Sequence, residues 1–256
     1  MILAVDVGNT NITFGIFRKD EITADFRMTS QIPRTADEYG LQILRLLEMN
    51  DINKDDLTGA AVSSVVPDVL QPLCESIPRY LGFRPLVVGP GTKTGINIKT
   101  DNPSEVGADR IVDIAGAYHF YGGPLLVLDF GTATTYDLVS PEGEFVAGLT
   151  APGIKISAKA LWEGTAKLPS IAIEKPSSIL ARNTITSMQA GLLYGQIGQT
   201  EYIIKHMREE SGYDDLKVVA TGGLGGIIAG STDTIDVYDI DLTLKGLKVI
   251  YDKNQQ

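Results

Sequence analysis

One short pattern occurs twice in the chain, and it limits the folds that the sequence can adopt. An apolar run ends in Asp6-Val7-Gly8-Asn9-Thr10, and a second apolar run ends in Asp129-Phe130-Gly131-Thr132-Ala133. In both places another β-rich segment follows at once. The two aspartates are 123 residues apart in a chain of 256 residues, which is close to half of its length. This spacing predicts two domains of similar fold.

Segments of strand and helix character alternate along the chain. The first apolar run and residues 12–17 flank a Gly-Asn turn, which predicts a β-hairpin. Residues 35–48 are predicted to be helical, because Thr35 and Glu38 fit a capping box and the leucines fall on one face. Residues 60–66 read as a buried strand. The alternation indicates an α/β fold.

The boundary between the two domains is predicted near residues 115–122. Gly116 and the sequence Gly122-Gly123-Pro124 interrupt the chain there. We therefore expect an N-terminal domain over residues 1–117 and a C-terminal domain over residues 118–256.

A long helix is predicted over residues 184–210, and it carries an unusual row of glycines. Gly191, Gly195 and Gly198 lie on one of its faces. Glycine destabilises an exposed helix interior by roughly 1 kcal/mol relative to alanine, so such a row needs a reason. We expect close packing against another helix, either within the fold or across a dimer.

Composition excludes several classes of function. Hydrophobic residues make up 43% and charged residues 21% of the chain, as in an ordered globular protein. The net charge of −10 argues against a nucleic-acid partner, whose binding needs Lys and Arg on phosphates. We expect no membrane partner and no signal peptide, because no apolar run is long enough and the first residues read as a strand. Cys74 is the one cysteine, so no internal disulfide forms and a cytoplasmic location is expected.

The turn after the first predicted strand is a candidate phosphate-binding loop. Gly8 lets the backbone approach a ligand, and Asn9, Thr10 and Asn11 offer side-chain donors beside successive N–H groups. Asp6 would repel a phosphate, so we expect it to act through a cation or the water shell of one. A plain tight hairpin in which Asp6 caps its own turn is the alternative.

The second copy of the pattern supports a phosphate-binding role. Gly131, Thr132 and Thr134 again supply small donors after Asp129. Two such loops, one from each domain, would face each other across a cleft and hold a nucleoside triphosphate. A threonine-rich strand without a ligand is the alternative, because threonine favours strands.

Two further segments are candidate parts of the site. Residues 100–110 are polar and rich in turns, and Asp109 and Arg110 stand where a helix begins. Asp109 is then either a base next to an arginine that holds a carboxylate, or a simple helix cap. Residues 220–226 contain four glycines after an apolar strand. They offer a flat surface to an adenine or ribose, or form only a glycine-rich turn.

These motifs, in this order, resemble the type III pantothenate kinases, members of the acetate and sugar kinase/Hsp70/actin superfamily. The resemblance covers nearly the whole chain and is carried by Asp6-Val7-Gly8-Asn9-Thr10, Asp101-Asn102-Pro103-x-Glu105-Val106-Gly107-Ala108-Asp109-Arg110, Asp129-Phe130-Gly131-Thr132-Ala133-Thr134, Pro152-Gly153, Asn183-Thr184 and Ser187-Met188-Gln189. It implies two ribonuclease-H-like domains with an interdomain cleft, as in actin-like ATPases, and usually a homodimer.

The resemblance also implies a reaction and the residues that perform it. It implies ATP-dependent phosphorylation of pantothenate to 4′-phosphopantothenate, the first step of coenzyme A biosynthesis, with Mg²⁺ accompanying ATP. Asp109 would accept the proton, and Asp129 would hold a monovalent cation, K⁺ or NH₄⁺. ATP would contact Asp6, Val7, Gly8, Asn9, Thr10, Asn11, Ile12, Thr13 and Thr132, and pantothenate would contact Thr100, Gly107, Ala108, Asp109, Arg110 and Thr184.

One position departs from the family pattern, and two other functions stay open. The family commonly has Tyr where Thr100 stands, and the smaller side chain removes an aromatic wall from the substrate. Arg110 could pair with the substrate carboxylate or with the transferring phosphoryl group. Another enzyme of the superfamily, such as a different small-alcohol kinase or a polyphosphate phosphatase, is one alternative. A nucleotide-binding regulator without catalysis is the other, and the intact Asp109 disfavours it.

Overall fold

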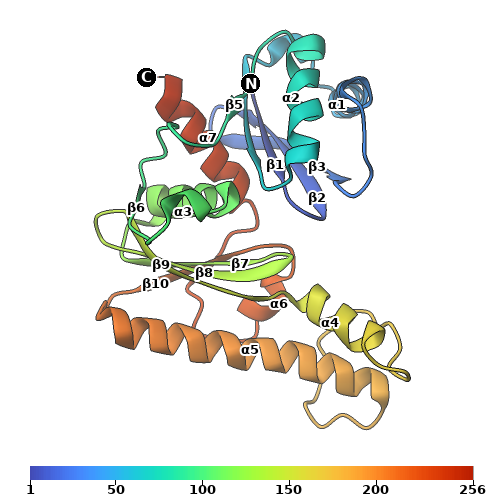
Figure 1. Ribbon diagram of the computed structural model, residues 1–256, viewed down its shortest axis with the longest axis vertical. Coiled ribbons are helices and arrows are strands. Elements are labelled where there is room, and N and C mark those ends of the chain that lie inside the picture. Colours follow the sequence, from blue (N-terminus) through green and yellow to red (C-terminus); the bar gives the residue numbers. More distant parts are fainter. Residues whose placement is uncertain (256) are drawn as a thin grey trace. The chain divides into compact units, whose positions relative to one another are not determined.

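Two sheets form the framework of the protein, one for each of two units (Figure 1). The computed structural model describes residues 1–255. The first unit comprises Met1–Ile96, Asp101–His119 and the described chain from Asp241 onward, and the second comprises Asn97–Thr100 and Phe120–Ile240. The change of unit after His119 lies close to the predicted boundary, whereas the C-terminal segment joins the first unit instead of the second.

The sheet of the first unit has the order β3-β2-β1-β4-β5. Its first three strands pair antiparallel, and the last two continue parallel on the other side of β1. The antiparallel pairing of β1 with β2 confirms the predicted hairpin. The strands are β1 (Ile2–Val7), β2 (Asn11–Arg18), β3 (Glu21–Thr29), β4 (Gly59–Ser64) and β5 (Leu86–Val87).

Helices pack against this sheet through apolar faces. They are α1 (Ala36–Met49), α2 (Pro67–Leu81), α3 (Ala108–Tyr121) and α7 (Leu242–Gln255), and two short 3₁₀ turns are η1 (Lys54–Asp56) and η2 (Pro103–Glu105). The predicted capping box at the start of α1 is confirmed. The Thr35 hydroxyl accepts from the backbone N–H of Glu38, whose carboxylate accepts from the N–H of Thr35.

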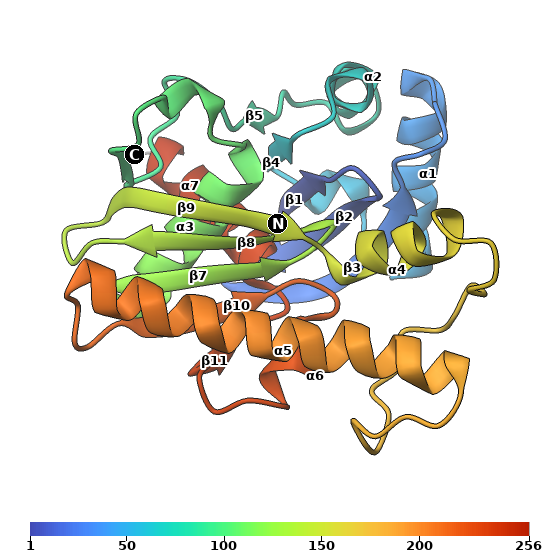
Figure 2. The same ribbon diagram turned by 60° about the horizontal axis from the view of Figure 1, so that its bottom comes forward.

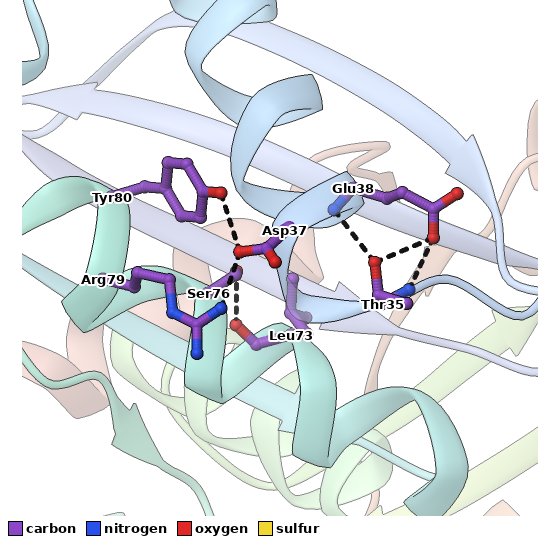
Figure 3. A network of polar contacts seen from close by, with 7 residues as sticks. All are labelled: Thr35, Asp37, Glu38, Leu73, Ser76, Arg79 and Tyr80. Carbon is purple, nitrogen blue, oxygen red and sulfur yellow. Dashed lines mark hydrogen bonds and ion pairs between the residues drawn. The ribbon is translucent and has the colours of Figure 1, made fainter.

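A polar network joins α1 to α2, as Figure 3 shows. The Asp37 carboxylate accepts a hydrogen bond of 2.6 Å from Arg79 and one of 2.8 Å from the hydroxyl of Tyr80. Gly40 is required for this approach, because a Cβ there would overlap the ring of Tyr80. The network links the first turn of α1 to the last turns of α2. Helix α1 begins a few residues after Ser30, whose N–H donates to the carbonyl of Thr10 in the first loop.

The C-terminal helix α7 belongs to the first unit for a packing reason. Leu244, Leu247 and Ile250 are buried in one cluster with residues of β1 and β4, including Ala4 and Ala61. The amphipathic face of α7 is thus covered by the first sheet. This contact explains why the segment does not group with the second unit, as its place in the sequence would suggest.

The sheet of the second unit repeats the arrangement of the first. Its order is β11-β10-β7-β8-β9-β6, in which β7, β8 and β9 pair antiparallel while β10 and β11 run parallel to β7. Apart from β6, the strand order β9-β8-β7-β10-β11 corresponds to the order β3-β2-β1-β4-β5 of the first sheet, with the same strand directions. The predicted internal repeat is therefore confirmed. The strands are β6 (Asn97–Ile98), β7 (Leu125–Phe130), β8 (Ala133–Val139), β9 (Glu144–Pro152), β10 (Lys217–Thr221) and β11 (Val237–Tyr238).

The long helix α5 (Thr184–Ser211) runs along the second sheet, accompanied by α4 (Ile154–Glu163) and α6 (Gly225–Ala229) (Figure 2). Leu193, Ile197 and Ile204 bury its inner face against the strands. A Cβ added at Gly191, Gly195 or Gly198 would meet no atom within 4 Å among the described residues. Close packing inside the described chain therefore does not explain these glycines, and a dimer contact stays a prediction. No helix within residues 1–255 has the length and apolarity that crossing a membrane requires.

Candidate active site

Asp6 lies near the end of β1, at the start of the first loop (residues 6–13), and burial and two neighbouring groups set its ionisation. In the sheet it lies between Thr13 of β2 and Ser63 of β4. The Ser63 hydroxyl donates a hydrogen bond of 2.6 Å to Oδ1 of Asp6. Burial raises the pKa of Asp6 to about 6, the bond from Ser63 opposes this rise, and the negative charge of Asp109 adds to it.

The first loop is a tight turn with its side chains on the outside. The N–H of Gly8 donates to the carbonyl of Asn11 over 3.0 Å, and the Thr10 carbonyl accepts from the N–H of Ser30 over 3.1 Å. The side chains of Asn9 and Asn11 are exposed. The turn thus presents donors to a ligand while the neighbouring strand holds its backbone, as a phosphate-binding loop requires.

Asp109 lies in the first turn of α3, and a glycine makes room for its carboxylate. Oδ1 accepts a hydrogen bond of 2.8 Å from the N–H of Arg110, so the side chain caps its own helix. A Cβ at Gly107 would stand 2.5 Å from that oxygen. The charge of Asp109 also acts on Asp6, which places the two carboxylates in one neighbourhood of the first unit. Capping and a role as base are therefore compatible.

Asp129 occupies in the second sheet the place that Asp6 has in the first. It pairs with Thr135 of the antiparallel neighbour and with Thr221 of the parallel neighbour, as Asp6 pairs with Thr13 and Ser63. In both sheets, hydroxyl-bearing residues flank the acid on either side. The equivalent places of the two acids agree with the repeated pattern of the sequence, whereas the flanking hydroxyl-bearing residues were not visible from the loop sequences alone.

Glycines enclose the carboxylate of Asp129 and the loop that follows it. A Cβ at Gly131 would lie 2.9 Å from Oδ2, and one at Gly222 would lie 2.5 Å from Oδ1. A Cβ at Gly153 would overlap the carbonyls of Gly131 and Thr132. The Pro152-Gly153 motif therefore packs on the second loop, and the glycine-rich turn after β10 touches Asp129 directly. Thr132 itself is exposed.

Thr184 lines an open groove of about 1040 Å³ in the second unit. The groove is bounded by α4, the segment before α5 and the first turns of α5, and its polar lining consists of Ser157, Arg182, Asn183, Thr184 and Ser187. Asn183 caps α5, because its side chain accepts from the N–H of Thr186 over 2.9 Å. Thr100 follows β6, and its hydroxyl is buried without a hydrogen-bond partner.

The structure thus groups the predicted residues by unit. The segment from Asp6 to Thr13 and the segment from Gly107 to Arg110 lie in the first unit, whereas Asp129, Thr132, Thr100 and Thr184 lie in the second. Ser63 was not predicted, although its place in the strand parallel to the first one was a usable signal. Within residues 1–255, no three His, Cys, Asp or Glu side chains cluster as a metal site.

Comparison with known proteins agrees with this arrangement. A model of the type III pantothenate kinase family matches residues 2–206. A type III pantothenate kinase of Agathobacter rectalis is 59% identical over 256 residues, which are all of this chain and 98% of that relative.

Solved structures of low sequence identity share the fold. A candidate 2-dehydro-3-deoxygalactonokinase of Sinorhizobium meliloti is 14% identical, with a TM-score of 0.58 over 99% of this chain and 96% of its own. A candidate N-acetylmannosamine kinase of Listeria monocytogenes is 16% identical, with a TM-score of 0.54 over 100% of this chain and 99% of its own. The two repeated sheets and these likenesses establish the predicted α/β fold of two ribonuclease-H-like domains. The family model and the full-length relative show that the chain belongs to the type III pantothenate kinase family.

Proposed function

We propose that the chain transfers the γ-phosphoryl group of ATP to the terminal hydroxyl of pantothenate, giving 4′-phosphopantothenate and ADP, the first step of coenzyme A biosynthesis. As a member of a kinase family it uses ATP with Mg²⁺. One observation carries the proposal: a type III pantothenate kinase is 59% identical to this chain over 256 residues. Asp109 at the start of α3 also acts electrostatically on Asp6, which is consistent with a base and a phosphate loop in one neighbourhood of the first unit. A plain hairpin or a simple helix cap would not need the two carboxylates together.

The residues divide the work of phosphoryl transfer. Such a reaction depends on alignment and on neutralising the charge of the phosphates more than on covalent catalysis. The first loop, from Asp6 to Thr13, offers N–H and side-chain donors to the phosphate oxygens. Asp109 accepts the proton of the attacking hydroxyl, which leaves late in the reaction. Thr132 of the second loop contacts the same nucleotide.

Bound cations supply positive charge that this acidic chain lacks. Mg²⁺ neutralises the triphosphate, and Asp6 is the carboxylate of the first loop that would hold it or its water shell. We also propose a monovalent cation, K⁺ or NH₄⁺, at Asp129. The oxygen donors there fit a hard cation: both carboxylate oxygens lie against glycine backbone, and Thr135 and Thr221 flank the acid.

Pantothenate is expected to contact two separate groups of residues. Gly107, Ala108 and Arg110 stand beside the base Asp109 at the start of α3. Arg110 can pair with the substrate carboxylate or with the transferring phosphoryl group. Thr184 lines the groove of the second unit, and Thr100 carries a buried hydroxyl without a partner. The hydroxyl of Thr184 is of the kind that binds a substrate with several polar groups, whereas the buried hydroxyl of Thr100 would have to become exposed to do so.

We also propose that the chain forms a homodimer and works in the cytoplasm. Three glycines of α5 open onto empty space, and Ile179, Leu180 and Ile185 are exposed close by in the sequence. A second copy would cover such a surface. The free thiol of Cys74 agrees with a reducing compartment. Sedimentation velocity should give a particle of twice 27.5 kDa, and a monomer at micromolar concentration would exclude the dimer.

The activity is tested by ADP formation with purified protein. ATP should be consumed only after pantothenate is added, and mass spectrometry should find one phosphate on the product. Replacing potassium by sodium should lower the rate if Asp129 holds a monovalent cation. Turnover of sugars or acetate without turnover of pantothenate would refute the substrate. ATP binding without any phosphoryl acceptor would indicate a non-catalytic regulator instead.

A further inference from the structure

The structure assigns to Tyr238 a positioning role. Its hydroxyl and ring hold the turn Gly222–Gly226 against Asp129, and this contact orders the second loop, residues 129–133, at the end of β7. This inference rests on the proposed function, because it takes that loop to bind ATP. Tyr238 lies in a part of the chain, residues 231–255, in which no sequence motif is visible. Its hydroxyl donates a hydrogen bond of 3.0 Å to the carbonyl of Gly222.

Gly222 connects this hydrogen bond to the acid of the second loop. Its φ of 90° lies in the left-handed region that favours glycine. A Cβ there would stand 2.5 Å from Oδ1 of Asp129 and 2.6 Å from the backbone nitrogen of Phe130. No side chain can therefore separate the turn from Asp129. A shift of the Gly222 peptide would move the atoms that pack against the Asp129 carboxylate.

The ring of Tyr238 supports the rest of the turn. A Cβ at Gly225 would lie 2.8 Å from a ring carbon, and one at Gly226 would lie 3.2 Å from another. The N–H of Gly225 donates to the same carbonyl of Gly222 over 3.0 Å. The turn thus packs closely on the ring of Tyr238, and this packing requires residues without a side chain at Gly225 and Gly226. This explains two of the four glycines without assigning them to a ligand.

The backbone of Tyr238 is fixed independently of the turn. In the parallel pair of β10 with β11, Tyr238 lies opposite Ala220, and the N–H of Asp239 donates to the Ala220 carbonyl over 2.8 Å. The Asp239 carboxylate accepts a hydrogen bond of 3.0 Å from the hydroxyl of Tyr121. Strand pairing holds the backbone of Tyr238 in place. Its side chain can therefore support the turn Gly222–Gly226 from a fixed position.

Removing the hydroxyl alone tests this role. In Tyr238→Phe the ring stays under the turn, and the bond to the Gly222 carbonyl is lost. We expect the Kd for the magnesium complex of a non-hydrolysable ATP analogue, measured by calorimetry, to rise about 2- to 10-fold, the range of one net hydrogen bond. In turnover, the KM for ATP should rise while the KM for pantothenate stays unchanged, a split that general loosening of the fold would not give.

Tyr194→Phe is the matched control. Tyr194 lies in the same unit and donates to the carbonyl of Pro176 over the same 3.0 Å. The substitution Tyr194→Phe should leave the Kd for the analogue unchanged. As a second variant, Gly225→Ala pushes the ring of Tyr238 away from the turn. It should raise the Kd for the analogue as Tyr238→Phe does.

Unchanged analogue affinity in Tyr238→Phe, or equal weakening in both tyrosine variants, would overturn the positioning role. Unmodified protein that binds the analogue but forms no ADP with pantothenate would overturn the proposed function alone. In that case the role of Tyr238 would still be supported by selective weakening of the analogue in Tyr238→Phe. Failure of the unmodified protein to bind the analogue would overturn both.

Discussion

The hydroxyl of Ser63 donates a hydrogen bond of 2.6 Å to Oδ1 of Asp6, from β4 to the neighbouring parallel strand β1. This bond favours the ionised carboxylate, whereas burial and the charge of Asp109 favour the protonated acid. The balance leaves the pKa of Asp6 at about 6. Asp6, which we propose to hold Mg²⁺ or its water shell, is thus ionised at neutral pH by a narrow margin, which the Ser63 hydroxyl helps to maintain.

Ser63→Ala should therefore move the acidic limb of the activity profile to higher pH. Without the donor, the pKa of Asp6 rises further above 6, and a larger share of the protein carries a protonated Asp6 at pH 7. The measurement is kcat/KM for ATP between pH 5.5 and 9. Ser64→Ala is the control, since the Ser64 hydroxyl hydrogen-bonds within the local turn, to the backbone of Val66. Superimposable profiles for Ser63→Ala and the unmodified protein would exclude the effect.

Asp6→Asn should stabilise the protein at alkaline pH while it removes activity. The folded pKa of about 6 lies above the unfolded value of 3.8, so protonation favours the folded state. That contribution is complete below pH 3.8 and is lost as the pH rises through 6. The amide cannot ionise, so the variant avoids this loss, which amounts to at most about 3 kcal/mol.

Urea unfolding at several pH values measures the difference. The variant should be more stable than the unmodified protein at pH 8 and equal to it near pH 3.5. A variant that is less stable at pH 8 would contradict the assigned burial of the carboxylate.

Asp109→Asn should abolish pantothenate-dependent ADP formation with the fold intact. The amide can still accept the hydrogen bond from the N–H of Arg110, so the helix start is preserved, but it cannot take up the substrate proton. A loss of about 10²- to 10⁴-fold in kcat is expected for a general base. Asp68→Asn removes another first-turn carboxylate, exposed on α2 of the same unit, and should keep full activity. Loss of one like charge should also lower the pKa of Asp6, which the stability profile can detect.

Local signals made much of this fold predictable. The hairpin, the capping box at Thr35 and the end of α5 at a left-handed glycine depend on neighbouring residues, and the structure confirms the first two as predicted. The repeated Asp-x-Gly pattern predicted two similar sheets because each copy ends the same strand of its unit.

Long-range contacts limited the rest of the prediction. The grouping of α7 with the first unit depends on which sheet covers Leu247 and Ile250, and sequence position points to the wrong unit. The contacts of Ser63 with Asp6 and of Tyr238 with Gly222 depend on strand register across many residues. The glycines of α5 were expected to pack, yet no partner for them lies within the described chain.

Thr35→Ala should destabilise the first unit through the start of α1. The substitution removes the hydroxyl that accepts from the N–H of Glu38 and so leaves a helix donor without its cap (Figure 3). The expected loss is about 1 kcal/mol of unfolding free energy. Thr35→Ser keeps the hydroxyl and should restore most of the stability. Equal stability of the alanine and serine variants would show that the cap contributes nothing.

Arg34→Ala should weaken ATP binding through the first loop, without a direct contact to the nucleotide. Arg34 Nη1 donates to the carbonyls of Thr29, over 2.8 Å, and of Ile32, over 3.3 Å. Residues 29 and 30 in turn support the carbonyl of Thr10, since the Ser30 N–H and the Thr29 hydroxyl both donate to it. Loss of the guanidinium frees this segment and with it the backbone of the loop.

The KM for ATP should rise about 2- to 10-fold, as expected for one net hydrogen bond, and the KM for pantothenate should stay constant. Arg34→Lys offers a single ammonium in place of the planar fork and should recover only part of the affinity. Arg45→Ala removes an exposed arginine of α1 and serves as the control. If Arg34→Ala and Arg45→Ala gave the same KM for ATP, the hydrogen bonds from Arg34 would have no part in ordering the loop. A rise confined to Arg34→Ala would show that the third strand, and not the hairpin turn alone, sets the geometry of the phosphate donors.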